Sequence, residues 1–573
     1  MSKKSAKKPP QAPAKADPQQ RAAFLAQEDA VYDALMAGDN EKARDLAASL
    51  PAYTGLLGNR ARIRCVAALE SGLLAEAQAY ADEYCRLQPD GNSHFFLARV
   101  RFANGERSGL LPLLEKALTE SITPGNMVRC YNLMATIYRG RGDAASSAAN
   151  FYRAYETAKK YGLDTASVEY DNYLFNSHYL PYDPAELAEK HFRYQEIAAG
   201  AGTGVCRLPL RRRENIRAGL PPERARKIRI GYISPDLHEH VVLYFSRFML
   251  TCADREKFAV YAYDHSIEDN YSQELKDAID GWRNIARLDY RDAARLVAAD
   301  NLDILIDLSG HTKNSVLGIL AYKPAPIIIS GIGYFSTTGL DAVDYFLSDI
   351  HLAGADEPGI YESPLFKEKL LVLPRTHWSY SHLHPRPASC LHTPARRKGY
   401  VSFGSFNALA KVNDEVLAAW KAILERVPGS HLILKGDAFV NPLDRKYQET
   451  RLKDFGFDMS RLDLWGSSPD YLDVYAEVDI ALDTFPYGGG ATTLDALYMS
   501  VPVISLIGGT HHARFGYSIL QNIGLGELAC GTVEEYIDRA CLIASDLETI
   551  DALHQNIRTM LENSILMDGR RYM

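Results

Sequence analysis

The chain lacks the features of membrane, secreted and disulfide-stapled proteins. None of its apolar stretches approaches the about 20 residues that a membrane-spanning helix needs, and no charged-then-apolar secretion signal opens it. Its eight cysteines include no Cys-x-x-Cys pair and follow no regular spacing. Neither a zinc ribbon nor a disulfide framework is therefore indicated. We expect reduced thiols in the core and a cytoplasmic location.

Acidic residues outnumber basic ones beyond the first twenty residues. Five lysines against one aspartate give residues 1–20 a formal charge of +4, so the remainder of a chain of net charge −8 carries −12. A net acidic body argues against a nucleic-acid partner held mainly by its phosphates. Residues 1–20 are almost free of apolar side chains, which predicts a disordered leader. Weak attraction of this leader to a membrane surface or a partner stays open.

The remaining composition is that of an ordinary globular protein of several domains. Hydrophobic residues make up 47% of the 573 residues and charged residues 24%, which is typical of folded chains without membrane embedding. A single hydrophobic core stops growing near about 250 to 300 residues. The length therefore predicts about three or four units.

Residues 21–180 read as helical repeats. They are rich in Ala and Leu, and four glycines recur at intervals of 34, 33 and 37 residues: Gly38, Gly72, Gly105 and Gly142. Five residues after these glycines come Ala43, Ala77, Leu110 and Ser147. The spacing matches the tetratricopeptide repeat of about 34 residues, whose stacked helix pairs commonly hold a peptide on their concave face. A plain helical bundle is the alternative.

A linker at residues 181–225 precedes two regions in which short β-branched runs alternate with helical stretches. In the first region, 226–375, these runs are 227–233, 258–263, 302–308, 326–332 and 342–347. A passage rich in Pro, His and Arg at 376–398 is interpreted as an interlobe connection. In the second region, 399–573, the runs are 400–403, 431–434, 461–465, 478–482 and 502–506. This alternation predicts two α/β Rossmann-like lobes, whose ligands bind beyond the carboxyl ends of the strands.

The segment DTFPYGGGATTLD, residues 483–495, is the strongest functional signal. A strand ends at Asp483, three glycines follow, and a helix is expected to begin at about Thr492. Small residues let the backbone approach a phosphate, and the amides at a helix start bind it. Thr492 and Thr493 are predicted to cap this helix, and Asp495 to accept hydrogen bonds from ribose hydroxyls. The alternative is a glycine-rich turn that serves only packing.

Two further segments directly follow predicted strands. SFNALAK, residues 405–411, places Lys411 where it could neutralise a leaving diphosphate, although a lone lysine there could also be a solvated surface residue. SPDLHEH, residues 234–240, offers His240 as a donor to phosphate or as a proton acceptor. His238 is the weaker candidate, and no third ligand is spaced to make the pair a metal site.

Weaker turn signals close other strands of the first region. They are DLSGHT, which contains His311, and GYFSTTG, residues 333–339, which contains Tyr334 and Thr337. These three residues are expected to face the same cleft and to contact the acceptor or the sugar.

The segments SPDLHEH, DLSGHT, KPAP (residues 323–326), GYFSTTGLDAVDY, GSFNALAK and DTFPYGGGATTLDAL together resemble the protein O-linked N-acetylglucosamine transferase family, including its Spindly-type fucosyltransferase branch. Their order and spacing agree over roughly residues 226–525. The resemblance implies a GT-B type fold behind a repeat arm. It also implies inverting transfer of a sugar from a nucleotide-sugar to Ser or Thr of a protein held by the repeats, without a metal ion or other cofactor.

The resemblance also assigns residues. Lys411 matches the lysine that contacts the donor diphosphate, Asp495 the ribose-binding acid, His240 a histidine near the reacting centre and Tyr471 an aromatic residue beside the nucleobase. The rest of the implied donor-binding set comprises Asn407, Gly489, Gly490, Ala491, Thr492 and Thr493. Whether His240 is the general base stays open.

Two departures from the family pattern leave the donor open. Gly490 and Ala491 stand where the N-acetylglucosamine branch has His and Thr, and Phe335 and Ser336 replace a Pro-Gly pair. UDP-N-acetylglucosamine is the expected donor. The alternatives are an O-fucosyl- or N-glucosyltransferase for dedicated bacterial surface or flagellar proteins, and a catalytically silent repeat scaffold.

Overall fold

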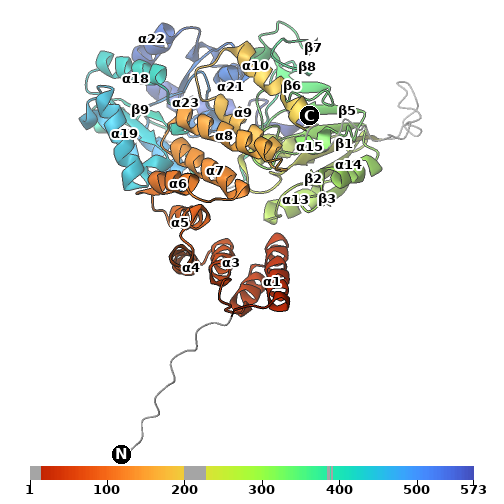
Figure 1. Cartoon of the computed structure of the whole chain (residues 1–573). Helices are drawn as coiled ribbons and strands as arrows, with labels where there is room; N and C mark the ends of the chain where they lie inside the picture. Colours follow the sequence, from red (N-terminus) through yellow and green to blue (C-terminus); the bar gives the residue numbers. More distant parts are fainter. Residues whose placement is uncertain (1–14, 199–226, 384–386, 389–390) are drawn as a thin grey trace, which may run out of the picture. The chain divides into compact units, whose positions relative to one another are not determined.

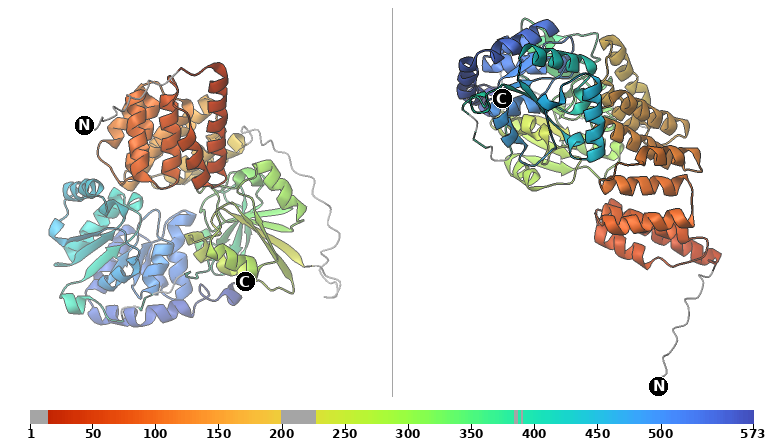
Figure 2. Two further views of the ribbon diagram at one scale, coloured as in Figure 1. Left: turned by 90° about the horizontal axis from the view of Figure 1, so that it is seen from below. Right: turned by 90° about the vertical axis from the view of Figure 1, so that its left-hand side faces the viewer.

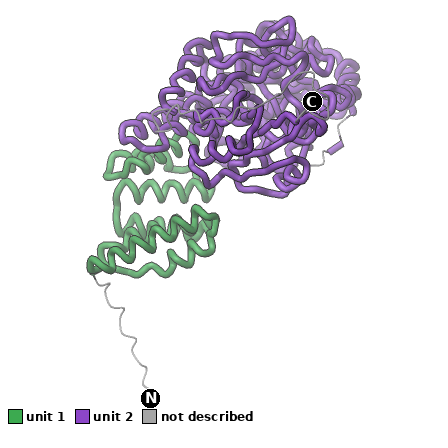
Figure 3. The backbone as a smooth tube through the Cα atoms, turned by 90° about the vertical axis from the view of Figure 1, so that its right-hand side faces the viewer, with its two compact units in different colours: residues 1–136 green, residues 137–573 purple. Residues whose placement is uncertain are grey.

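The computed structural model describes residues 15–198, 227–383, 387–388 and 391–573. The chain divides into two compact units, residues 1–136 and 137–573 (Figure 3). Among the described residues no helix has the length and apolar character to cross a membrane. The cysteines in these parts of the chain are free thiols, as predicted, and Cys65, Cys130 and Cys530 are buried.

The first unit consists of consecutive helices: α1 (Pro18–Met36), α2 (Asn40–Ser49), α3 (Leu57–Glu70), α4 (Leu74–Leu87), α5 (Gly91–Ala103), α6 (Leu110–Thr119) and most of α7 (Pro124–Gly140). Gly38, Gly72 and Gly105 lie in the left-handed region, with φ of 74°, 73° and 81°, which explains why glycine recurs at these turns. Ala43 and Ala77 are fully buried between helices. The predicted helical repeats are confirmed.

Helix α1 begins three residues before the predicted boundary at residue 21. Asp17 caps the helix by accepting a hydrogen bond from the Gln20 amide, and the Gln20 side chain accepts one from the Asp17 amide. With Pro18 as the first helical residue, this is a capping box that the sequence already displays. Residues 1–14 of the predicted leader lie outside the described part of the chain.

The second unit opens with helices α8 (Ala144–Lys160), α9 (Ala166–Ser177), α10 (Pro184–Phe192) and α11 (Tyr194–Ala198). The last two lie in the predicted linker 181–225, so its first part is helical. Asp183 accepts hydrogen bonds from the amides of Ala185 and Glu186 and thereby starts α10. These helices share a hydrophobic core with the first sheet, in which Tyr170 and Leu174 pack with Ile233 and Leu305. Residues 199–225 lie outside the described residues.

The first lobe contains an eight-stranded sheet in the order β3-β2-β1-β4-β5-β6-β8-β7 (Figure 1). All neighbours are parallel except β7 and β8. Its strands are β1 (Ile228–Ser234), β2 (Phe258–Asp264), β3 (Gly281–Asn284), β4 (Ile304–Asp307), β5 (Ile327–Ser330), β6 (Tyr345–Asp349), β7 (Gly359–Tyr361) and β8 (Lys369–Leu373). The connecting helices include α12 (Val241–Thr251), α13 (Asn270–Ala278), α14 (Tyr290–Ala299), α15 (Leu317–Leu320) and α16 (Ile350–Ala353).

The second lobe contains a six-stranded parallel sheet in the order β11-β10-β9-β12-β13-β14. Its strands are β9 (Ser402–Ser405), β10 (His431–Lys435), β11 (Leu462–Trp465), β12 (Ile480–Leu482), β13 (Val503–Leu506) and β14 (Ala529–Cys530). Helices surround the sheet (Figure 2), among them α18 (Asp414–Arg426), α19 (Pro442–Asp454), α20 (Ala491–Tyr498), α21 (Phe515–Ile523), α22 (Val533–Ala544) and α23 (Leu547–Glu562). The predicted α/β fold with two Rossmann-like lobes is confirmed.

The end of the chain returns to the first lobe. The phenol of Tyr572, in α24 (Gly569–Tyr572), donates a hydrogen bond to the carbonyl of His377, and the amide of Tyr380 donates one to the carbonyl of Leu566. A Cβ at Gly569 would lie 2.6 Å from the ring of Phe248 in α12. The last residues of the predicted second lobe therefore pack on the first.

Candidate active site

The site lies at the point where the strand order of the second sheet reverses. Strands β10 and β11 lie on one side of β9, and β12 to β14 lie on the other. The loops that follow β9 and β12 therefore leave the sheet side by side, at the position where open α/β sheets bind their ligands. Thr492 donates a hydrogen bond from Oγ1 to Oδ1 of Asn407 (3.0 Å), which joins the two segments identified from the sequence.

Asp483 shapes the glycine-rich turn after β12. Its Oδ1 accepts hydrogen bonds from the amides of Gly489 (2.7 Å) and Thr484 (2.9 Å), and its Oδ2 accepts one from Oγ of Ser505 (2.8 Å). Burial raises the pKa of Asp483, and these hydrogen bonds and the charge of Lys411 oppose the rise. The sequence identified Asp483 only as the end of a strand. An acidic residue five positions before a glycine run was the available signal.

Helix α20 begins at Ala491, with Gly490 as its N-cap, and no side chain among the described residues caps it. The predicted capping by Thr492 and Thr493 is therefore wrong, because Thr492 uses its hydroxyl to bind Asn407 instead. The amides of the first turn keep their donor capacity and the positive end of the helix dipole. This arrangement suits an anionic ligand.

Two glycines of the turn are constrained by their neighbours. A Cβ at Gly489 would lie 2.5 Å from Oγ1 of Thr492 and 2.6 Å from Oγ1 of Thr493. A Cβ at Gly490 would lie 3.0 Å from the ring of Trp378. This indole is buried and stacks on Phe245 of the first lobe, with ring centroids 5.0 Å apart. Trp378 thus occupies the space beside Gly490, a role for which the sequence gave no signal.

Lys411 lies against the turn. Its Nζ donates a hydrogen bond to the carbonyl of Gly488 (2.8 Å) and lies 3.8 Å from the ring centroid of Tyr487. Burial lowers the pKa of Lys411 to about 8, opposed by the charge of Asp483. Phe335 of the first lobe packs on Tyr487 with ring centroids 4.6 Å apart. The Tyr487 ring on which Lys411 lies therefore contacts the first lobe, and the placement of Lys411 in an interlobe cleft stays a prediction.

The predicted ribose and nucleobase residues bind each other. Asp495 is buried, and its Oδ2 accepts a hydrogen bond from the phenol of Tyr471 (2.6 Å). Its Oδ1 accepts a second one from the phenol of Tyr380 (2.8 Å), in the interlobe connection. The structure thus brings Asp495 and Tyr471 together at α20, and their contacts with a nucleotide stay a prediction.

His240 lies in the first lobe, where it is the N-cap of α12. Its Nδ1 accepts a hydrogen bond from the amide of Val242 (3.3 Å) and lies 3.6 Å from Oδ1 of Asp236. Burial lowers the pKa of His240, and the charge of Asp236 opposes this. Because Nδ1 accepts, the neutral ring carries its proton on Nε2. In this tautomer His240 offers a hydrogen-bond donor.

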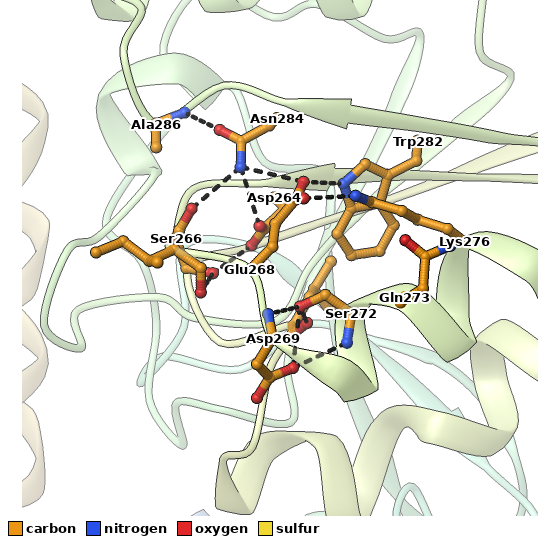
Figure 4. A network of polar contacts seen from close by, with 12 residues as sticks. Asp264, Ser266, Glu268, Asp269, Ser272, Gln273, Lys276, Trp282, Asn284 and Ala286 are labelled. Atoms are coloured by element: carbon orange, nitrogen blue, oxygen red, sulfur yellow. Dashed lines mark hydrogen bonds and ion pairs between the residues drawn. The ribbon is translucent and has the colours of Figure 1, made fainter. Parts of the chain in front are cut away.

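The loop that carries His240 is held by Asp269 and Ser272, two members of the polar network in Figure 4. The amide of Glu239 donates to Oδ2 of Asp269 (2.7 Å), and Oγ of Ser272 donates to the carbonyl of Leu237 (2.8 Å). Within the same network, Glu268 accepts hydrogen bonds from Trp282, Asn284 and Lys276. The loops after β1 and β2 are therefore joined to each other, and the loop after β2 is joined to strand β3.

Three residues predicted on the acceptor side do not face a cleft. His311 is buried, with Nδ1 2.5 Å from Oδ1 of Asp171 in α9. Tyr334 is buried, with its phenol 2.7 Å from Nε2 of His191 in α10. Thr337 is buried and donates to Glu368. The prediction that these residues face a cleft was wrong, because helices α9 and α10 cover His311 and Tyr334, and Thr337 is bound to Glu368 inside the lobe.

Two Rossmann-like lobes, with a lysine and an uncapped helix start at the switch point of the second, define a glycosyltransferase of the GT-B class. The family model of glycosyl transferase family 41 matches residues 216–387 and 396–573, which is more than half of the chain. The chain belongs to this family.

Curated relatives match about three fifths of the chain. The chain is 37% identical over 355 residues to the barley (Hordeum vulgare) probable UDP-N-acetylglucosamine–peptide N-acetylglucosaminyltransferase SPINDLY, covering 61% of this chain and 37% of that protein. It is 27% identical over 382 residues to the Arabidopsis thaliana protein of the same description named SEC, covering 62% and 37%. The matches thus span little more than a third of these relatives.

A solved structure resembles the whole chain. A mutant of the Thermobaculum terrenum O-GlcNAc transferase superposes with a TM-score of 0.70 at 25% sequence identity, covering 97% of this chain and 96% of that one. The likeness therefore includes the helical region as well as both lobes.

Proposed function

We propose that the protein is an inverting glycosyltransferase that moves N-acetylglucosamine from UDP-N-acetylglucosamine to Ser or Thr hydroxyls of proteins. The observation that carries the proposal is the pairing of Lys411 with the uncapped start of α20 at the switch point of the second sheet. Membership of glycosyl transferase family 41 and the names of the curated relatives support it.

The chemistry of this site matches the departure of a diphosphate. In inverting transfer, the sugar carbon becomes cation-like while a hydroxyl attacks one face and the leaving group departs from the other. The amides of Ala491 and Thr492 and the charge of Lys411 would stabilise the negative charge that grows on the diphosphate. A single preorganised donor of this kind contributes roughly 3 to 4 kcal/mol.

His240 is proposed to act on the sugar side as a hydrogen-bond donor. The loop that carries it is held by the network around Asp269 and Ser272, and its Nδ1 is engaged by the Val242 amide. A role as general base would require a proton-free Nε2, and the tautomer inferred from the Val242 hydrogen bond places the proton there instead. Kinetics of His240→Gln, which keeps a donor, and His240→Ala test this. Equal losses in both variants would refute the donor role.

The proposal includes neither a metal ion nor another cofactor. Lys411 and the amides of α20 supply the positive charge that a divalent cation would otherwise bring to the diphosphate. Transfer is therefore expected to persist in excess EDTA, and restoration of a lost activity by Mg²⁺ or Mn²⁺ would refute this part.

The acceptor is proposed to be a protein segment guided by the helical repeats. Relatives whose printed names include a peptide acceptor support this, as do the stacked helix pairs at the start of the chain. The decisive experiment is intact-mass analysis of an acceptor protein co-expressed with this chain, because the added mass identifies the sugar. An acceptor of unchanged mass would contradict the proposal.

GDP-fucose is retained as a second candidate donor because of one difference from the N-acetylglucosamine branch. The space next to Gly490 contains the indole of Trp378, whereas the N-acetylglucosamine branch of the resembling family has a histidine at position 490. The wall of the donor site therefore differs from that branch. Thermal-shift measurements with UDP-sugars and GDP-fucose distinguish the donors, including UDP-glucose for N-glucosyl transfer. If no nucleotide raises the melting temperature, the scaffold alternative is favoured.

A further inference from the structure

An aromatic contact connects the helical region of the second unit to Lys411. The ring of Tyr487, over which Lys411 Nζ lies at 3.8 Å, also stacks with the ring of Tyr179, with centroids 5.5 Å apart and an interplanar angle of 16°. Tyr179 follows helix α9, far from Lys411 in the sequence. A residue outside both lobes thus contacts the ring that supports the lysine.

The turn between α7 and α8 contacts the segment that carries Lys411, at Leu409. A Cβ at Gly142 would lie 3.1 Å from the carbonyl of Leu409, two residues before Lys411. Arg141 Nε donates to Oδ1 of Asp444 (3.0 Å), and Gln448 donates to the carbonyl of Arg141. The helical region therefore contacts both the Lys411 segment and the Tyr487 turn.

A third contact involves the loop after β13. The phenol of Tyr182 lies 2.6 Å from Nε2 of His512 and 3.0 Å from Oγ1 of Thr510. His512 packs on Tyr487 with ring centroids 5.3 Å apart. Tyr179 and Tyr182 thus enclose one side of the turn.

We propose that Tyr179 is a positioning residue for Lys411: by stacking on Tyr487 it holds the ring against which the lysine lies and keeps water from the amine. The inference rests on the proposed role of Lys411 at the donor diphosphate. In this role Tyr179, at the end of the helical region, becomes a part of the donor site. It acts through the Tyr487 ring on the orientation and hydration of the Lys411 amine.

The alternative is that Tyr179 only attaches the helices to the second lobe. The two roles differ in their effect on the titration of Lys411. The charged and titratable groups around the amine are Asp483, Tyr487 and His512, and Arg139 lies near Tyr179. Removing the Tyr179 ring would let water reach the amine without changing these groups, which raises the pKa of Lys411 from about 8 toward its ordinary value.

The experiment compares Tyr179→Phe, Tyr179→Leu and Tyr179→Ala in the full chain, with Tyr161→Ala as the control. Tyr161 is an exposed tyrosine of the same helical region. For each variant, kcat, KM for the donor and the pH profile of kcat/KM are measured. Tyr179→Phe keeps the stacked ring and is expected to remain near the unmodified protein. Leu and Ala are expected to lower kcat about tenfold, the scale of a desolvated cation–π contact, with KM for the donor within about twofold.

The pH profile and a double variant make the result decisive. In Tyr179→Leu and Tyr179→Ala, the fall of kcat/KM at alkaline pH is expected to move to higher pH, and in Tyr161→Ala to stay in place. Tyr179→Ala is expected to have no further effect in a Lys411→Ala background, because coupled residues are not additive. Unchanged kcat and an unchanged profile in a folded Tyr179→Leu would overturn the inference.

Failure of the proposed function has a different signature. If Lys411→Ala alone retains full activity, Lys411 has no role at the diphosphate and both ideas fall. If Lys411→Ala is inactive while both non-aromatic variants of Tyr179 behave as the unmodified protein, only the positioning role is refuted.

Discussion

The amine of Lys411 is subject to two opposing influences. Burial disfavours its charge and lowers its pKa to about 8, while the carboxylate of Asp483 favours the charge. The balance leaves the amine mostly protonated at neutral pH. A charged donor is thereby available where a leaving diphosphate would accumulate charge.

Replacing this lysine should separate chemistry from folding. Lys411→Ala is expected to lower turnover at least about a hundredfold, because a preorganised donor contributes roughly 3 to 4 kcal/mol to the transition state. Steady-state kinetics and circular dichroism of the variant check this. Lys446→Ala removes an exposed lysine of α19 and serves as the control. Near-normal transfer by a folded Lys411→Ala would exclude the proposed role.

The same residue predicts the alkaline side of the pH profile. Because the folded pKa of Lys411 lies near 8, its charge is present below that pH and is lost as the pH rises through it. The value of kcat/KM is expected to fall above about pH 8. Lys411→Arg keeps its charge at all accessible pH values. In this variant kcat/KM should be lower overall and should not show the alkaline limb, which is the fall above about pH 8. An identical limb in the arginine variant would assign it to another group.

At the scale of elements, the site depends on a turn with little room for side chains at its three glycines. The carboxylate of Asp483 accepts a hydrogen bond from the amide of Gly489 in the turn. The hydroxyls of Thr492 and Thr493 fill the space beside Gly489. These contacts fix the position of the first turn of α20, which follows β12 and has no side-chain cap. The three glycines thus serve packing as well as the proposed phosphate contact, so the packing role considered from the sequence is also present.

Gly489→Ala tests the turn. The added methyl group would lie 2.5 to 2.6 Å from two hydroxyl oxygens, and overpacking of this kind costs about 1 to 3 kcal/mol. Calorimetry with UDP is expected to show at least about tenfold weaker binding, together with a lower melting temperature. Gly509→Ala is the matched control, because nothing lies within 4 Å of its Cβ position. Equal binding of UDP by both variants would contradict this account of the turn.

The neighbouring pair of Gly490 and Trp378 predicts a specificity experiment. In Gly490→His the imidazole would collide with the indole, whose ring lies 3.0 Å from the Cβ position, so nucleotide binding is expected to weaken. Combining it with Trp378→Ala frees the space and should recover part of the affinity. Titrations of UDP and GDP with both variants measure the effect. A double variant that binds no better than Gly490→His would show that the collision is not the cause.

At the scale of the whole molecule, buried polar contacts fix one lobe to the other. Asp349, at the end of β6, accepts hydrogen bonds from the amides of His351 and Leu352, from the amide and Nδ1 of His377, and from Oγ of Ser518 in the second lobe (2.9 Å). Arg514 Nε donates to the carbonyl of His351 (2.6 Å) in the same region. Hydrogen bonds from Ser518 and Arg514 of the second lobe thus fix its position against the end of β6 and the start of α16.

Asp349→Ala and Ser518→Ala should differ sharply in stability. The first leaves several buried donors without an acceptor, and each such group costs about 1 to 3 kcal/mol. The second removes one hydrogen bond, which contributes about 1 kcal/mol. Differential scanning calorimetry is expected to show a much larger fall in melting temperature for Asp349→Ala. Equal falls would mean that the contacts of Asp349 within its own lobe contribute little.

Much of the fold could be predicted from local patterns. The runs that became β1, β4 and β5 are rich in isoleucine, and those that became β2 and β6 contain aromatic residues, so their composition indicated strands. Strand β3 has the sequence GWRN and β14 comprises two residues, so both lack such a pattern. They form because parallel neighbours supply their hydrogen bonds.

The candidate site also contains residues that local patterns placed correctly and residues that they misplaced. Lys411, Asn407 and Thr492 could be assigned to one place because carboxyl ends of neighbouring parallel strands share a sheet edge. His311 and Tyr334 also follow strands, yet helices that precede the lobes in the sequence cover them. No local sequence pattern reveals that these helices pack over His311 and Tyr334.

By itself, then, the sequence determined the order of helical repeats and parallel-sheet lobes and the residues that can meet at the second lobe's sheet edge, because periodicity and strand-end position are local properties of a chain. The tertiary structure alone decided which strand ends stay open, and that Trp378 and Tyr179 border the turn. Both depend on packing between segments far apart in the sequence, and such contacts leave no local trace.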